Sequence, residues 1–260
     1  MRITLAQIDS HIGNFEGNLK KILSAMEVAR AENADIVVFP ELATCGYPPR
    51  DFLEFKDFIL ESDRLVDHIR MASKNLAVLI GSPAFNPDKL GKDLHNAAFF
   101  IYDQQIIHKQ VKTLLPTYDI FDEYRYFEPN TDFKVIEFKG YRLALTICED
   151  LWNLGNENPL YKICPLDEMM GQHPDIIFNI SASPFAYDHA QERIEVVKAN
   201  VIKYKKPLFY CNTVGSQTDV VFDGGSLVFS PDGDVYDELP YFEECIRTYD
   251  LTAIAKEGKT

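Results

Sequence analysis

Short apolar, β-rich runs alternate with amphipathic helical stretches along the first part of the chain, and this alternation limits the folds open to it. It is typical of α/β proteins, in which strands form a sheet and helices cover its faces. In the middle of the chain, short turns such as Asp103-Gln104 and Lys139-Gly140 join successive strand-like runs, which predicts antiparallel pairing there. We therefore expect an α/β fold with layered sheets of mixed strand direction and helices on both sides.

The same periodicities place the individual elements. Strands are expected at Arg2–Ile8, Asp35–Phe39, Leu76–Gly81, Leu94–Tyr102, Gln105–Val111, Phe133–Phe138, Tyr141–Ile147, Asp175–Ile180, Leu208–Asn212, Val220–Phe229 and Cys245–Tyr249. Helices are expected at Asn14–Glu32, Phe58–Ala72 and His189–Lys205. The 260 residues contain no Ser/Gly-rich linker, low-complexity segment or clear repeat, so we expect residues 1–260 to form one domain.

Composition excludes several classes of function. Forty acidic and 26 basic side chains give a net charge of −14, which repels nucleic-acid backbones and anionic membrane surfaces. The apolar runs that begin at Leu76 and Ala97 are shorter than the roughly 20 residues of a membrane-spanning helix. The first residues, MRITLAQID, resemble a strand rather than a signal peptide. We expect a soluble, cytoplasmic protein that binds neither nucleic acid nor membranes.

The five cysteines form no CxxC pair and no cluster with histidine. This argues against a metal site and against a disulfide framework. Four of the cysteines, Cys45, Cys164, Cys211 and Cys245, are interpreted as small core residues. Cys148 is different because of the residues around it.

Three chemically reactive side chains follow predicted strands. Glu41 comes just after the strand that Pro40 ends, Lys112 follows the strand that ends at Val111, and Cys148 follows the strand that ends at Ile147. Sites in layered α/β folds form at the carboxyl ends of strands. Taken singly, a Glu or Lys at such a place is most often a solvated loop charge. An acid, an amine and a thiol at three strand ends predict a shared site.

Amide hydrolysis explains why these three groups belong together. A thiol attacks as its thiolate, so Cys148 needs a proton acceptor, and Glu41 can serve. The tetrahedral intermediate carries an oxyanion that the Lys112 ammonium and a backbone N–H can stabilise. None of the six histidines lies in a segment that resembles a Cys/His enzyme signature.

Three segments resemble the signatures of the nitrilase, or carbon–nitrogen hydrolase, superfamily. They are Phe39-Pro-Glu-Leu-Ala-Thr-Cys-Gly-Tyr47, Lys112-Thr-Leu-Leu-Pro-Thr-Tyr118 and Ile147-Cys-Glu-Asp-Leu-Trp152. The resemblance runs from Ile3 to about Tyr249. It implies a four-layer α-β-β-α sandwich and a catalytic triad of Glu41, Lys112 and Cys148.

Further segments resemble one branch of this superfamily, the glutaminase domain of glutamine-dependent NAD synthetases. They are Gly46-Tyr-Pro-Pro-Arg-Asp-Phe-Leu53, Leu115-Pro-Thr-Tyr-Asp-Ile-Phe-Asp-Glu-Tyr-Arg-Tyr-Phe127, Asn179-Ile-Ser-Ala-Ser-Pro-Phe185 and Val221-Phe-Asp-Gly-Gly-Ser226. The resemblance implies hydrolysis of the glutamine side-chain amide through a Cys thioester. The ammonia would serve NAD synthesis from deamido-NAD.

The same resemblance implies roles for other residues. Tyr118 and Ser183 would contact glutamine, the N–H of Glu149 would join the oxyanion hole, and Glu123 would be a second carboxylate that orients Lys112. Where the branch has a Lys or Arg facing the substrate carboxylate, this chain has His189. A His fills that role only when protonated or as a neutral donor. Its other interpretation is a solvated residue at the start of a helix.

The synthetase half of such an enzyme would carry a Ser-Gly-Gly-x-Asp-Ser loop, and this chain has only Asp223-Gly-Gly-Ser226 between β-rich runs. We interpret that segment as a tight strand bend. No GxGxxG or GxxxxGK[ST] motif occurs, so neither ATP nor NAD is expected to bind, and the amidase step needs no cofactor.

We expect the glutaminase domain of a longer enzyme, with a synthetase domain or subunit as partner and self-association into at least a dimer. Two alternatives remain at this point. One is a free-standing amidase or nitrilase that acts on another small amide, and the other is a non-catalytic subunit.

Overall fold

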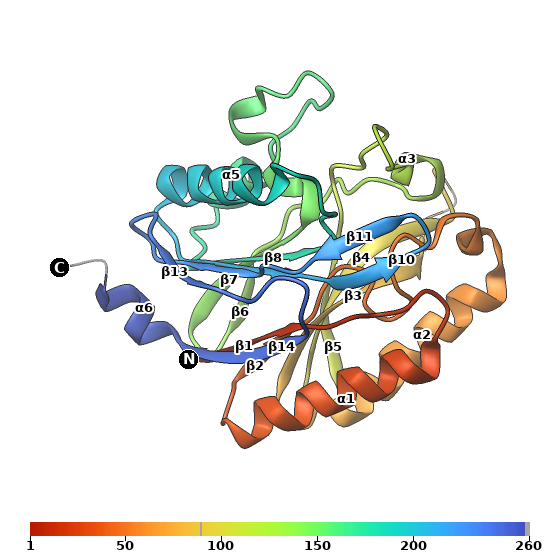
Figure 1. The fold of residues 1–260 in the computed structure, drawn as a ribbon, viewed down its shortest axis with the longest axis horizontal. Coiled ribbons are helices and arrows are strands. Elements are labelled where there is room, and N and C mark those ends of the chain that lie inside the picture. Colours follow the sequence, from red (N-terminus) through yellow and green to blue (C-terminus); the bar gives the residue numbers. More distant parts are fainter. Residues whose placement is uncertain (89, 258–260) are drawn as a thin grey trace.

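The computed structural model describes residues 1–88 and 90–257 (Figure 1). Its strands are β1 Arg2–Gln7, β2 Ile36–Val38, β3 Ala77–Phe85, β4 Leu94–Tyr102, β5 Gln105–Val111, β6 Ile136–Phe138, β7 Tyr141–Ile147, β8 Ile176–Ser181, β9 Leu208–Asn212, β10 Val214–Gln217, β11 Val220–Asp223, β12 Leu227–Phe229, β13 Val235–Glu238 and β14 Cys245–Asp250. Its α-helices are α1 Phe15–Ala31, α2 Lys56–Ala72, α3 Glu123–Tyr126, α4 Pro165–Met170, α5 His189–Tyr204 and α6 Leu251–Glu257. Short 3-10 turns lie at Arg50–Glu54, Cys148–Leu151 and Leu154–Asn156.

The strands form two six-stranded sheets and one small hairpin sheet. The first large sheet has the order β14-β1-β2-β3-β4-β5, and the second has the order β13-β12-β9-β8-β7-β6. Each sheet has a parallel centre, β1-β2-β3 in the first and β7-β8-β9 in the second, and antiparallel strands at both edges. Mixed sheets of this kind need helices over the parallel part, because parallel strands are joined by crossovers.

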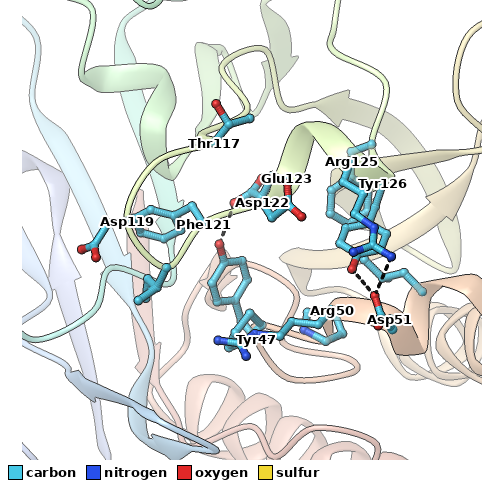
Figure 2. Close-up of a pocket in the computed structure, with 15 residues that line it drawn as sticks. Tyr47, Arg50, Asp51, Thr117, Asp119, Phe121, Asp122, Glu123, Arg125 and Tyr126 are labelled. Atoms are coloured by element: carbon cyan, nitrogen blue, oxygen red, sulfur yellow. Dashed lines mark hydrogen bonds and ion pairs between the residues drawn. The ribbon is translucent and has the colours of Figure 1, made fainter.

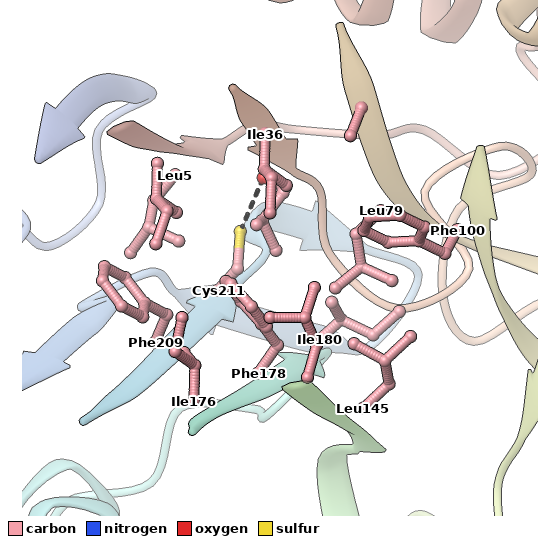
Figure 3. Packing of buried hydrophobic residues seen from close by; sticks show 14 of the residues in the cluster. Leu5, Ile36, Leu79, Phe100, Leu145, Ile176, Phe178, Ile180, Phe209 and Cys211 are labelled. Atoms are coloured by element: carbon pink, nitrogen blue, oxygen red, sulfur yellow. Dashed lines mark hydrogen bonds between the residues drawn. The ribbon is translucent and has the colours of Figure 1, made fainter. Parts of the chain in front are cut away.

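The two large sheets pack face to face, with helices outside (Figure 1). Side chains such as Leu5 and Leu79 from the first sheet meet Phe178 and Cys211 from the second in one buried cluster (Figure 3). A second cluster joins the first sheet to α1 and α2, and a third joins the second sheet to α4 and α5. The result is an α-β-β-α sandwich, and the predicted fold class is confirmed.

Most predicted elements are present within one to three residues. Helix α1 starts where the Asn14 side chain accepts a hydrogen bond from the Gly17 N–H at 3.1 Å, as a helix N-cap does. The predicted antiparallel hairpins at residues 94–111 and 133–147 are both confirmed, and the second begins at Ile136. The turns between their strands place non-glycine residues, Gln104 and Lys139 among them, at positive φ.

One expected strand needs correction. The expected strand Val220–Phe229 is two strands, because Gly224 and Gly225 take positive φ and turn the chain from the hairpin sheet into the second large sheet. A Cβ on Gly224 would lie 2.5 Å from the Gln7 side chain, so only glycine fits this bend. The interpretation of Asp223–Ser226 as a tight bend is therefore confirmed, but the prediction of one continuous strand from Val220 to Phe229 was wrong.

The cysteines are all free thiols. Cys45, Cys164 and Cys211 are buried, as expected of core residues, whereas Cys245 is half-buried and packs against the edge of the core. In the part of the chain that the structure describes, no helix combines the length and apolar character needed to cross a membrane.

Candidate active site

The three predicted reactive residues lie at the carboxyl ends of their strands. Lys112 directly follows β5, Cys148 directly follows β7, and Glu41 follows β2 after Phe39 and Pro40. All three side chains are buried, with relative exposures of 0%, 6% and 1% respectively. Since β2 and β5 belong to the first sheet and β7 to the second, the site bridges the two sheets at one end of the sandwich.

Cys148 has an unusual backbone. Its φ is +44°, a left-handed conformation that costs a non-glycine residue on the order of 1–3 kcal/mol. The Asn179 side chain, which comes from β8, donates a hydrogen bond to the Cys148 carbonyl oxygen at 3.3 Å. Such strain persists only where neighbours fix it.

Lys112 joins two carboxylates in a buried ionic cluster. Its Nζ lies 2.7 Å from Glu41 Oε1 and 2.7 Å from Glu123 Oε1. Glu123 is thus in direct contact with Lys112, and its role in orienting the ammonium stays a prediction. Glu123 stands at the start of the short helix α3, some way along the chain from the strand that ends at Val111.

Neutral groups complete the hydrogen bonding of this cluster. Asn96 Nδ2 donates to Glu41 Oε1 at 2.7 Å and to Glu123 Oε2 at 3.3 Å. The Tyr47 hydroxyl donates to Glu123 Oε1 at 2.7 Å, and the Ala182 N–H donates to Glu41 Oε2 at 3.0 Å. Figure 2 shows the Tyr47–Glu123 bond at the wall of a cavity of ≈ 480 Å³. Both carboxylates are thus held in fixed orientations.

The charges of the cluster shift the pKa values of its members. Burial favours the neutral amine of Lys112, but Glu123 and Glu41 outweigh it and hold the Lys112 pKa well above its usual value. Burial raises the pKa of Glu123 to about 7, with Lys112 opposing and Glu41 adding to the rise. Burial, and then the negative charge of Glu41, raise the pKa of the Cys148 thiol well above its ordinary value, while Lys112 lowers it.

This arrangement suits nucleophilic chemistry with a proton acceptor at hand. A buried thiol with a raised pKa is protonated at neutral pH, so it needs a base before it can attack. A fixed ammonium in a site of low polarity stabilises negative charge far better than one in water does. Among the described residues, no group of His, Cys, Asp and Glu could hold a metal ion.

A cavity of ≈ 500 Å³ opens above Cys148. All the predicted substrate-contact residues line it: Tyr118, Glu149, Ser183 and His189. Trp152, which ends the Ile147–Trp152 motif, lines it as well. A cavity of this size accommodates a small molecule such as an amino acid.

The cavity walls are tied together by polar contacts. Tyr118 and Tyr161 both donate to Glu149 Oε1, at 2.9 and 2.8 Å. Ser183 Oγ and His189 Nε2 lie 3.0 Å apart, and the His189 ring stacks on Trp152 with centroids 5.3 Å apart. His189 begins α5, as the second interpretation had it, but its ring forms part of the cavity wall and is not free in solvent.

Some site residues were not singled out from the sequence. Tyr47 and Asp150 stand within the quoted motifs, so a closer reading of those segments could have found them. Asn96 and Asn179 lie inside strands, and a lone Asn in an apolar strand was the available signal. Tyr161 lies in an irregular loop, where nothing in the sequence marks it.

Comparison with known proteins agrees with this geometry. The family model of the carbon–nitrogen hydrolases matches residues 2–256. The chain belongs to the carbon–nitrogen hydrolase family. The matched range includes the segments that carry Glu41, Lys112 and Cys148.

Several similar members of the family are curated as glutamine-dependent NAD(+) synthetases. The one from Thermotoga maritima is 36% identical over 251 residues, which are 96% of this chain and 42% of that protein. The one from Synechocystis sp. is 35% identical over 264 residues, covering 96% of this chain and 46% of that protein. The chain thus spans less than half the length of these relatives.

Solved structures give the same picture. The glutamine-dependent NAD+ synthetase of Acinetobacter baumannii superposes with a TM-score of 0.87 at 27% identity, covering 97% of this chain and 46% of that one. An amidase of the nitrilase superfamily from Nesterenkonia superposes with a TM-score of 0.83 over 96% of this chain and 90% of that one. At 21% identity, the amidase supports the shared fold alone.

Proposed function

We propose that this carbon–nitrogen hydrolase removes the side-chain amide of glutamine, with Cys148 as nucleophile, Glu41 as general base and Lys112 beside the oxyanion. The observation that carries the proposal is the buried Glu41–Lys112–Glu123 cluster, whose charges act on the Cys148 thiol at the floor of a cavity. The similarity to glutamine-dependent NAD synthetases supports glutamine as the substrate.

In the first half-reaction, the Cys148 thiol gives its proton to Glu41 and the sulfur attacks the amide carbon. The carbonyl oxygen becomes an oxyanion, which the Lys112 ammonium and the Glu149 N–H stabilise. When the C–N bond breaks, the leaving nitrogen takes the proton from Glu41 and departs as ammonia. The products are ammonia and a thioester on Cys148.

In the second half-reaction, a water gives a proton to Glu41 and adds to the thioester carbon. The C–S bond then breaks, and the sulfur recovers the proton from Glu41 as glutamate leaves. Throughout, Glu123 keeps Lys112 in place through its 2.7 Å contact. Lys112 itself remains an ammonium, in keeping with its raised pKa.

The cavity offers groups for the amino-acid end of glutamine. Tyr118 and Ser183 contribute hydroxyls, and His189 offers its ring to the substrate carboxylate. His189 Nε2 lies 3.0 Å from Ser183 Oγ, so both side chains can bind the same substrate carboxylate.

The proposal extends to the setting of the reaction. Ammonia would pass to a synthetase domain or subunit, where it forms the amide of NAD from deamido-NAD. The fused synthetases among the relatives support this pairing. A cytoplasmic location and a homo-oligomer of at least two chains belong to the same proposal.

The direct test measures ammonia and glutamate released from glutamine, with and without a matching synthetase domain supplied with ATP and deamido-NAD. We expect hydrolysis that is low in isolation and rises with the partner, and we expect a glutamine-like electrophile to label Cys148. Labelling mainly at Cys45 or Cys211, which are buried away from this cavity, would overturn the assignment of the nucleophile.

A second candidate is hydrolysis of another small amide by a free-standing enzyme. It is favoured by His189, which replaces the expected Lys or Arg opposite a substrate carboxylate. Kinetics on a panel of amides with and without an α-carboxylate separates the two. A preference for uncharged amides, with no response to a synthetase domain, would favour the second candidate.

A further inference from the structure

Asp150 joins the segment that carries Lys112 to the segment that carries Cys148. Its Oδ1 accepts hydrogen bonds from the Thr113 and Leu114 N–H groups, both at 2.9 Å. Its Oδ2 accepts one from the Ile147 N–H at 3.0 Å. One carboxylate thus holds the two residues after Lys112 and the residue before Cys148.

This connection spans the two sheets. Lys112 follows β5 in the first sheet, and Ile147 ends β7 in the second. The packing between the sheets is mainly apolar, and hydrogen bonds add contacts of defined length and direction to it. Asp150 is 2% exposed, so no water competes for its three donors.

We propose that Asp150 is a positioning residue that sets the distance between the Lys112 ammonium and the Cys148 sulfur. This rests on the proposed roles of Lys112 and Cys148. Displacements of about 1 Å between reacting groups are enough to reduce turnover on the order of 10²-fold. Asp150 itself touches neither the substrate cavity nor the two reactive atoms in the described contacts.

Burial makes the ionised form of Asp150 costly. It raises the pKa of Asp150 to about 7, although the N–H donors of Leu114, Ile147 and Thr113 and the charge of Lys112 act in the opposite direction. A side chain placed at such a cost is expected to do something that a neutral acceptor cannot. An amide has one acceptor oxygen, so it cannot serve both segments at once.

The test is Asp150→Asn, measured by steady-state kinetics and by the rate at which iodoacetamide alkylates Cys148 as a function of pH. The Asn oxygen can keep the Thr113 and Leu114 bonds, but its NH₂ group then faces the Ile147 N–H. We expect kcat to fall about 10- to 100-fold with KM changed less than threefold, and we expect the midpoint of the alkylation profile to move.

Asn200→Ala is the matched control. The Asn200 side chain donates to the Leu151 carbonyl at 2.9 Å, so it anchors the same turn to α5 without touching the Lys112 segment. This variant should lose stability but keep the wild-type kcat and alkylation profile. If Asp150→Asn changes only stability, as Asn200→Ala does, the positioning role is overturned.

Where Asp150→Asn does not fold, Asp150→Ser, which keeps an acceptor oxygen in a smaller volume, is measured in the same way. If neither variant folds while Asn200→Ala does, Asp150 serves the fold rather than the site, and the proposal fails. The alkylation rate requires no substrate. A moved alkylation profile in the variant, together with no glutamine hydrolysis by the wild-type protein, would therefore support the positioning role while refuting the proposed function.

Discussion

Among the residues that the structure describes, two ion-paired groups are buried, and they differ in their balance of charge. Arg193 on α5 meets Asp223 at the end of β11 with two parallel contacts of 3.0 Å, one base to one acid. Lys112 meets two acids, Glu41 and Glu123, so that group carries a surplus negative charge. Side chains in both groups are at most 5% exposed.

The difference separates a structural pair from a reactive one. A bidentate Arg–carboxylate pair balances one charge with the other and leaves no group seeking a proton. A surplus carboxylate in a buried site is costly, and its cost appears as raised pKa values in Glu123 and Cys148. Perturbed groups of this kind mark functional sites more often than matched pairs do. The comparison therefore predicts that changes to the two groups have different consequences.

Glu41→Gln should have the largest effect. The amide cannot accept the thiol proton or activate water, so kcat should fall by up to about 10⁴-fold, the upper end of what a general base contributes. The fold should survive, because the Gln oxygen can still accept hydrogen bonds from Asn96 and Lys112. Glutamate release and thermal unfolding are measured in parallel with Glu137→Gln on the surface. Turnover close to that of the control would remove Glu41 from the mechanism.

Lys112→Ala comes next. The ammonium is needed most when negative charge develops on the oxyanion, so kcat should fall by about 10²-fold or more, with a smaller change in KM. Lys112→Arg should not restore it, because the planar guanidinium is too large for a site shaped around an ammonium between two carboxylates. Near wild-type turnover of Lys112→Ala would contradict its role.

Arg193→Met should reverse the pattern. It leaves the Asp223 carboxylate buried and unpaired, so unfolding free energy should fall by about 3–5 kcal/mol, as for other broken buried pairs. The kcat of the folded fraction should change by only a few-fold. Urea unfolding and active-site titration with an electrophile provide both numbers. A large loss of turnover in the folded fraction with unchanged unfolding free energy would contradict the purely structural role of the Arg193–Asp223 pair.

The sequence predicted the structure best for residues that directly follow a strand. The positions of Glu41, Lys112 and Cys148 were predicted from the ends of strands, and the end of a strand can be recognised from the local residue pattern. The α-β-β-α layering came from the family resemblance, because a local pattern does not say which strands share a sheet. Asn96 and Tyr47 come from two other segments and donate hydrogen bonds to Glu123, which contacts Lys112. Only packing decides that these segments meet. The break at Gly224-Gly225 was missed because apolar residues continue on both sides of it.

Glu123→Gln should have the smallest effect, and it tests the surplus charge directly through pH. The pKa of Glu123 rises from its ordinary 4.5 to about 7 in the fold, so between these values the folded state holds a proton that the unfolded state has released. The stability from this proton is fully present below pH 4.5 and is lost as pH rises through 7, at up to about 1.4 kcal/mol per pH unit.

Glu123→Gln is neutral at every pH and lacks this slope, so its unfolding free energy relative to wild type should rise between pH 5 and 7 and then level off. Urea unfolding at pH 5, 6, 7 and 8 measures the difference between the two proteins, which cancels the slopes of other groups such as Asp150. Glu137→Gln, which removes an exposed carboxylate 78% accessible to solvent, should run parallel to wild type over the same range. A difference that stays flat with pH, or that falls as pH rises, would mean that Glu123 is ionised throughout. The surplus negative charge would then cause no protonation in the Lys112 cluster. Charge imbalance would therefore not distinguish this cluster from the Arg193–Asp223 pair.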